Sequence, residues 1–247
     1  MSGHSKWSTI KRKKEKTDGA RAKVFTKIGR ELAVAVREGG SADPSSNSKL
    51  RDCIAKAKAN NVPNDNIERI IKKAAGDNDS SKYEAITYEG YGPNGIALIV
   101  ETLTDNRNRT AGDLRHYFDK FGGNMGTPGC VSYMFSRKGI IIIEKTDAVD
   151  EDALLETALE AGADDMIVQE DSFEIVTDPS AYTDVHHALA DAGYEIVESD
   201  VEYVPSMEAA PKDEHDIAKL AKMIEILEDN DDVQKVYTNC SIDLFEE

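Results

Sequence analysis

The chain has 247 residues and a formal net charge of −17, with 40% hydrophobic and 31% charged residues. Its longest apolar runs have the length of a β-strand, far short of the roughly 20 residues that cross a bilayer, so we expect no membrane protein. Three widely separated cysteines form no C-x-x-C pair, and the basic N-terminus has no apolar stretch behind it. We therefore expect a cytoplasmic protein with reduced thiols.

Charge is unevenly distributed along the chain. Residues 1–75 contain 18 Lys and Arg against 8 Asp and Glu, a net charge of +10. The remaining residues contain 12 against 39, a net charge of −27. Such asymmetry is typical of a segment that faces nucleic acid and is attached to an acidic body.

The basic segment opens with an arm around the only tryptophan of the chain. Its cations can neutralise phosphates, and the indole ring can stack on an unpaired base. The alternative is a solvated arm, or one that folds back on the acidic body. The candidate nucleic-acid-binding residues of the arm are Lys6, Trp7, Lys11, Arg12, Lys13, Lys14 and Lys16.

Three helices are predicted after the arm. Apolar residues repeat at helical spacing over 21–37 and again over 50–57, and a third helix is predicted over 63–76, between a proline and a glycine. In the first helix, Lys23, Lys27 and Arg30 lie opposite the apolar stripe. We predict that this face continues the phosphate-binding surface of the arm.

The periodicity changes after a polar linker at 76–82. Strands are predicted over 83–89, 96–103 and 130–135, with a helix between the last two whose capping box begins at Thr110.

Arg107 and Arg109 precede this helix in the predicted loop. Two guanidinium groups beside exposed backbone N–H groups suit a phosphate, although surface pairing with nearby acidic residues explains them equally well.

A block from 139 to 204 has the element order β-α-β-β-α-β of a ferredoxin-like sandwich. A final helix and a strand over 233–238 complete the earlier β-β-α-β set. We predict an α+β protein, with an N-terminal three-helix domain followed by two ferredoxin-like α/β domains, the third inserted into the second; a linear order of three domains is the alternative. The predicted limits are 1–78 for the arm and helical domain, 79–132 with 206–247 for the discontinuous domain, and 133–205 for the inserted domain.

Catalytic motifs are sparse. The five histidines form no H-E-x-x-H, and G-x-S-x-G is absent. A hydrolase that used the acidic stretches at 150–152 or 229–232 would need a metal, but acidic residues at helix starts are common without one. We expect no enzyme, no catalytic residue, no metal and no cofactor.

Long segments of the chain resemble the YebC/PmpR family, which includes a mitochondrial translational activator of cytochrome oxidase. The resemblance covers essentially the whole chain and implies the helical domain, the two α/β domains and no accepted catalytic residue. The segments that carry it are GHSKW (3–7), 18–40, 43–74, 88–110 and the Gly-rich GGNMGTPGCVSYMF (122–135).

The resemblance implies two candidate functions. Bacterial members are commonly described as DNA-binding transcriptional regulators, whereas the mitochondrial branch and some bacterial members resemble ribosome-associated factors that relieve stalling at proline runs. The arm is rich in Lys and has few residues that read base edges, which favours ribosomal RNA over a specific duplex. An adaptor that binds no nucleic acid would leave the basic segment unexplained. We expect a monomer whose partners are the ribosome and its RNA, or duplex DNA, and no membrane.

Overall fold

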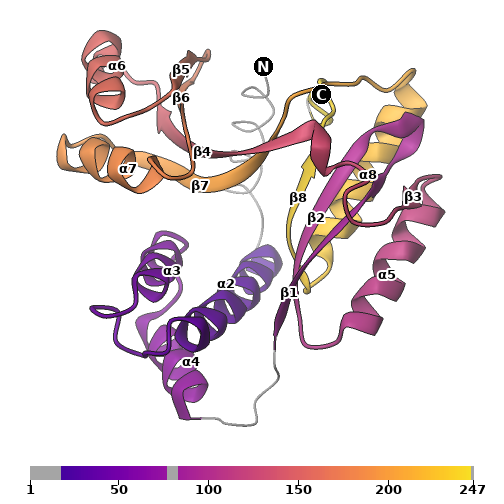
Figure 1. Ribbon diagram of the computed structural model, residues 1–247, viewed down its shortest axis with the longest axis horizontal. Helices are drawn as coiled ribbons and strands as arrows, with labels where there is room; N and C mark the ends of the chain where they lie inside the picture. The colour runs from indigo at the N-terminus through magenta and orange to yellow at the C-terminus, as the bar shows by residue number, and fades with distance from the viewer. Residues whose placement is uncertain (1–17, 77–82, 246–247) are drawn as a thin grey trace. The chain divides into compact units, whose positions relative to one another are not determined.

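The computed structural model describes residues 18–76 and 83–245 of the chain (Figure 1). These residues form three N-terminal helices, followed by two sheets of four antiparallel strands with helices, which confirms the predicted α+β class. They divide into two compact units, one from residues up to 128 with 219–236, the other from 129–218 with the residues from 237 onward. None of the described helices has the length and apolar character that a membrane span requires.

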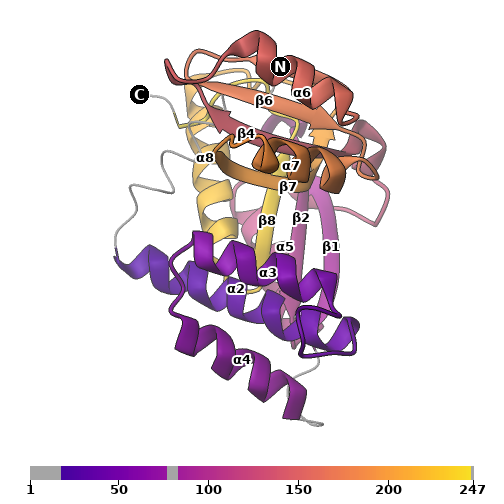
Figure 2. The ribbon, with the colours of Figure 1, turned by 90° about the vertical axis from the view of Figure 1, so that its left-hand side faces the viewer.

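The N-terminal helices form a small bundle with its own core. The helices are α2 (Asp18–Glu38), α3 (Ser48–Ala59) and α4 (Asn64–Gly76), and α2 packs against both of the others (Figure 2). Asn47 starts α3 by accepting a hydrogen bond from the N–H of Leu50. The buried core consists of Ile28, Leu32, Ala35, Val36, Leu50, Ala57, Val62 and Ile67. The predicted apolar stripes therefore face one another.

The first sheet combines strands from both ends of the chain. A hairpin begins it, and its strand order is β3-β1-β2-β8. Its strands are β1 (Glu84–Tyr91), β2 (Ala97–Thr104), β3 (Asn124–Met125) and β8 (Val233–Thr238).

Two helices cover one face of this sheet. They are α5 (Arg107–Lys120) and α8 (Glu214–Asp229), which lie on the same side of the strands in Figure 1. Space beside Gly90 is filled by Phe118 of α5, and space beside Gly92 by Leu220 and Met223 of α8. Gly90 lies in β1 and Gly92 follows the strand in extended conformation, so both glycines face the same side and α5 and α8 share one layer.

The second sheet lies between β3 and β8 in the sequence. Its order β5-β6-β4-β7 places the first and third strands of the block side by side at the centre, as in a ferredoxin-like sandwich. Buried residues of α6 and α7 pack on the same face of β4 and β6. The limits predicted for the three domains from the sequence stay a prediction. The elements are β4 (Phe135–Glu144), α6 (Glu151–Glu160), β5 (Asp165–Val168), β6 (Ser172–Thr177), α7 (Tyr182–Asp191) and β7 (Ile196–Pro205).

The prediction of a strand over 130–135 was wrong. A 3-10 helix spans Ser132–Met134, and one continuous strand begins at Phe135. The short strand β3 instead lies beside β1, where Gly90 pairs with Met125. A single turn of apolar residues does not distinguish a 3-10 helix from a strand, whereas the missing side chain at Gly90 lets β3 lie close.

The predicted start of α5 was also wrong. The helix begins one turn earlier because the side chain of Asn106 accepts a hydrogen bond from the N–H of Arg109. Thr110 is fully buried inside the helix and does not cap it. Among several residues that can cap a helix, the sequence alone does not identify the one that does.

We expect Gly90→Ala to lower the free energy of unfolding by about 1–3 kcal/mol, the usual cost of overpacking. A Cβ at this position would lie 2.5 Å from the carbonyl oxygen of Asn124 and 2.6 Å from the ring of Phe118. Gly112→Ala is the matched control because it lies inside α5 with open space around it. The control should gain about 0.5–1 kcal/mol. Urea unfolding measures both, and equal changes in the two variants would contradict this view of β3.

Candidate nucleic-acid interface

The predicted site residues fall into two groups. Lys6, Trp7, Lys11, Arg12, Lys13, Lys14 and Lys16 lie outside the described residues. Lys23, Lys27, Arg30, Arg107 and Arg109 lie within them.

Three cations of α2 form a row that meets the C-terminal end of α8. Lys23, Lys27 and Arg30 follow one another at i, i+4 and i+7, so they share one helix face, and we call them the cation row. The Nζ of Lys23 lies 2.7 Å from Oδ2 of Asp229, and the Nζ of Lys27 donates to the carbonyl oxygen of Glu228 over 2.7 Å. Both acceptors belong to the last turn of α8.

Arg30 makes the most buried contacts of the row, and its side chain is only 15% exposed. Its Nη1 donates to the carbonyl oxygen of Asp231 over 2.6 Å and to Oδ1 of Asp232 over 2.7 Å. The guanidinium group also lies 5.4 Å from the centre of the Tyr83 ring. Residues 228–232, which we call the acidic turn, thus hold all three cations through carboxylate and carbonyl oxygens.

Asp232 is the most buried member of the acidic turn, with a side chain only 3% exposed. Besides Arg30, the Nη2 of Arg109 donates to its two oxygens over 3.0 and 2.8 Å. The hydroxyl of Thr110 lies 2.8 Å from Oδ2, and that of Thr104 lies 3.2 Å away. One carboxylate therefore joins α2, α5, the end of β2 and the start of β8.

These partners keep Asp232 ionised. Burial alone would raise its pKa, but the hydrogen bonds from Arg109, Thr110 and Arg30 outweigh burial and lower the pKa of this carboxyl below its ordinary value. Arg109 shows the reciprocal effect, since its hydrogen bonds to Asp232 and Asp105 raise the pKa of its guanidinium. Asp232 therefore forms structural ion pairs with Arg30 and Arg109.

The end of α8 explains why α2 supplies the cations. A helix C-terminus carries the negative end of the macrodipole, which favours basic residues in the last turn. The last turn of α8 has none and instead contains Glu228 and Asp229. The cation row, some 200 residues earlier in the chain, provides the missing positive charge.

Arg107 and Arg109 lie at the start of α5 and not in a loop ahead of it. Both lie in the first turn of α5, and Arg109 is committed to Asp105 and Asp232. The side chain of Arg107 is exposed, while its carbonyl oxygen accepts a 3.5 Å hydrogen bond from Tyr88.

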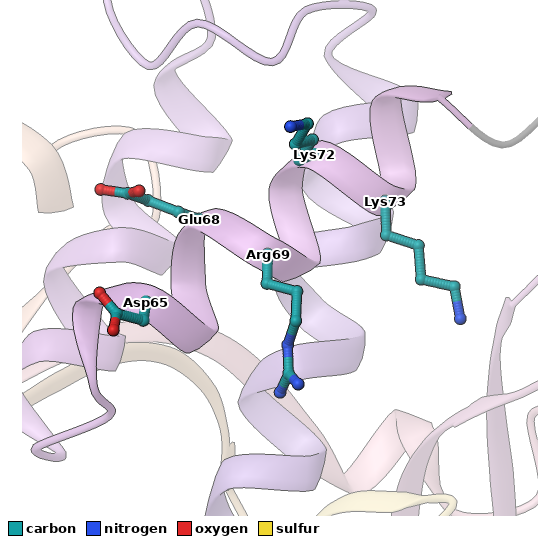
Figure 3. A pocket seen from close by; sticks show the side chains of 5 residues that line it. All are labelled: Asp65, Glu68, Arg69, Lys72 and Lys73. Atoms are coloured by element: carbon teal, nitrogen blue, oxygen red, sulfur yellow. The ribbon is translucent and has the colours of Figure 1, made fainter.

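Exposed cations also line the outer faces of α3 and α4. Arg51 and Lys58 are exposed on α3, two turns apart. On α4, Arg69 and Lys73 extend to one side of the helix and Lys72 to the other (Figure 3). Together with Asp65 and Glu68 they border an open, shallow depression of about 470 Å³. Its lining comes from a single helix, which suits a surface contact rather than an enclosed small molecule.

The acidic stretches considered for a hydrolase have structural roles. Asp150 caps α6 by accepting a hydrogen bond from the N–H of Ala153. Asp229 and Asp232 are held by the cation row and by Arg109.

Sequence reasoning missed Asp232 and the threonines that bind it. A useful signal was present, because a helix whose last turn contains acidic residues and no basic residue favours cations supplied from elsewhere in the fold.

We expect Asp232→Asn to lower the free energy of unfolding by about 3 kcal/mol, because the substitution leaves buried Arg30 without its counter-charge. Denaturant unfolding of the full chain measures the loss. Glu38→Gln is the matched control, since Glu38 pairs with Lys49 where both side chains are more than half exposed. The control should cost less than about 1 kcal/mol, and an equal loss in both variants would contradict the role of Asp232.

The contribution of Asp232 should depend on pH with a defined sign. Its pKa is lower in the folded chain, so its ionised form stabilises the fold above its ordinary pKa near 4, and this stability is lost as pH falls through the folded pKa. The difference in unfolding free energy between wild type and Asp232→Asn should be largest near neutral pH and shrink below about pH 4. Urea titrations from pH 7 down to pH 2.5 measure it, and a difference that grows on acidification would contradict the assignment.

Comparisons with known proteins agree with the sequence and the fold. Residues 5–77 match the TACO1/YebC protein N-terminal domain, and residues 83–240 match the TACO1/YebC second and third domain. A "Probable transcriptional regulatory protein" of Ruminiclostridium cellulolyticum is 59% identical over 93% of this chain and 92% of its own. One of the same name from Acetivibrio thermocellus is 57% identical over 97% and 98%.

A solved structure has the same architecture. The crystal structure of a conserved hypothetical protein, Aq1575 from Aquifex aeolicus, superimposes with a TM-score of 0.83 at 42% identity, over 92% of this chain and 93% of that one. With both family models matching and relatives identical at more than half of their positions, this chain belongs to the TACO1/YebC family.

Proposed function

We propose that this chain is a nucleic-acid-binding regulator of gene expression that acts on the ribosome, as a translation factor that relieves stalling at proline-rich stretches. The observation that carries the proposal is the separation of charge, with +10 in the first 75 residues and −27 in the rest. A surface of this kind binds phosphates at one end and is repelled by them elsewhere, which favours one orientation on RNA.

The types of cation favour RNA in a ribosome over a specific duplex. Three of the five exposed cations named on α3 and α4 are lysines, which contact phosphates as point charges and carry little sequence information. Ribosomal RNA offers dense phosphates together with unstacked bases, on which Trp7 of the arm can stack.

Such a factor acts by positioning the peptidyl-tRNA. Holding the peptidyl-tRNA in a productive geometry accelerates a slow transfer to proline without a protein side chain in the reaction. The structural roles of Asp150 and Asp232 are compatible with this view, since neither acidic stretch considered for a hydrolase is set up as a catalytic pair.

A DNA-binding transcriptional regulator is the second candidate. The names of the two bacterial relatives favour it. So does the helix pair formed by α3 and α4, because α3 ends at Ala59 and α4 begins at Asn64 after a short turn. Two helices joined by a short turn are the framework of many duplex-binding proteins.

Co-sedimentation with ribosomes at near-physiological salt tests the two candidates. The full chain should pellet with ribosomes, and a variant lacking residues 1–17 should stay largely in the supernatant. With about six phosphate contacts, the logarithm of the binding constant should fall with the logarithm of salt concentration at a slope of roughly −4 to −5.

The matched control keeps the length of the arm and removes part of its charge, through Lys6→Gln, Lys11→Gln, Lys13→Gln and Lys14→Gln. It should bind weakly, with a shallower salt dependence. A mobility shift on a promoter duplex is run at the same salt. Protein that stays free of ribosomes, yet shifts one duplex at nanomolar concentration and not its scrambled version, would overturn the translation factor in favour of the second candidate.

A further inference from the structure

We propose that the acidic turn is an internal competitor of RNA, which occupies the cation row in the free protein and is displaced by the phosphate backbone of single-stranded RNA. This inference rests on the proposed function, because it assumes that the chain binds RNA. It adds a regulated surface to the cations predicted for the arm.

The chemistry of the two occupants is the same. Lys23, Lys27 and Arg30 each meet anionic or partly negative oxygens at 2.6–2.7 Å. A phosphate backbone presents oxygens of this kind in a row, and the row on α2 presents its cations along one helix face. Acceptor oxygens that hold a cation also deny it to a phosphate.

The contact between the cation row and the acidic turn is polar and separable. The core of the helical bundle contains residues of α2, α3 and α4 and of the turn before α4, so its apolar packing is complete without the acidic turn. Polar contacts between parts of a chain open more readily than apolar ones, and salt or a competing polyanion weakens them.

Burial is graded along the row. At its outer end, the side chains of Lys23 and Asp229 are 42% and 69% exposed, so their attraction is screened. At its inner end, the side chain of Arg30 is 15% exposed. A polyanion that arrives from solvent therefore first displaces Asp229 from Lys23, the most exposed pair, and displaces the acceptors of Arg30 last.

Release of Arg30 leaves no buried charge without a partner. Arg109, Thr110 and Thr104 still bind Asp232, and Arg109 alone contacts both of its oxygens. Because an orphaned buried carboxylate is what makes breaking such a pair costly, this second set of donors lowers the cost of opening. Arg30, in turn, exchanges a carboxylate for a phosphate.

The test measures binding of a fluorescent 20-nucleotide oligo(U) RNA to the full-length chain at fixed salt. Glu228→Gln, Asp229→Asn and Asp231→Asn together remove three of the four carboxylates of the acidic turn, while Asp232 and the cation row are retained. This triple variant should bind at least about fivefold more tightly, because Lys23 loses its ion pair with Asp229 and three negative charges that repel phosphates are removed beside the cation row. The matched control removes three exposed carboxylates from α6, through Asp152→Asn, Glu156→Gln and Glu160→Gln, and changes the net charge by the same amount.

Further variants separate the possible outcomes. Adding Lys23→Gln and Lys27→Gln to the triple variant should abolish the gain in affinity and make the salt dependence shallower. A triple variant that binds no more tightly than the α6 control would overturn the inference alone, as would a gain that survives the loss of the two lysines. Wild type and all variants failing to bind oligo(U) while the full chain still pellets with ribosomes would overturn this inference alone, whereas failure in both assays would overturn the proposed function as well.

Discussion

The contacts that join α2, α5 and the end of β2 depend on the C-terminal end of α8, a helix near the other end of the sequence. The C-terminus of α8 combines the negative end of a macrodipole with two carboxylates in its last turn, and the buried Asp232 follows three residues later. Charge of this density is stable only where cations and hydroxyl groups surround it. The fold supplies them from α2, from α5 and from the end of β2, so the electrostatic needs of residues 228–232 hold those segments together.

The sequence predicted the parts of the fold that follow from periodicity. Long amphipathic helices such as α2 and strands with a continuous apolar run such as β2 can be recognised from their own residues, because they bury much apolar surface. The predictions that were wrong concern elements whose type or start is determined by tertiary contacts. Asn124 and Met125 form a strand because Gly90 leaves room for them, and Asn106 rather than Thr110 starts α5 because Thr110 is needed to bind Asp232. Neither fact is encoded within a few residues of the element concerned.

The candidate site was predictable in composition but not in orientation. A helical wheel groups Lys23, Lys27 and Arg30 correctly, yet it does not reveal what the shared face meets. The face meets the acidic turn about 200 residues later, a pairing that no local pattern specifies. Under our proposal the acidic turn and the phosphates of a nucleic acid compete for these three cations, because both present oxygen acceptors.

The distance between these segments in the sequence has a consequence for the growing chain. Domains fold from the N-terminus during synthesis, and the helical bundle has all of its core residues once residue 74 has been made. Its cations then have no acidic turn to meet until residues 228–232 have been added. A chain that stops before residue 228 therefore lacks the carboxylate and carbonyl oxygens that hold Lys23, Lys27 and Arg30 in the folded protein.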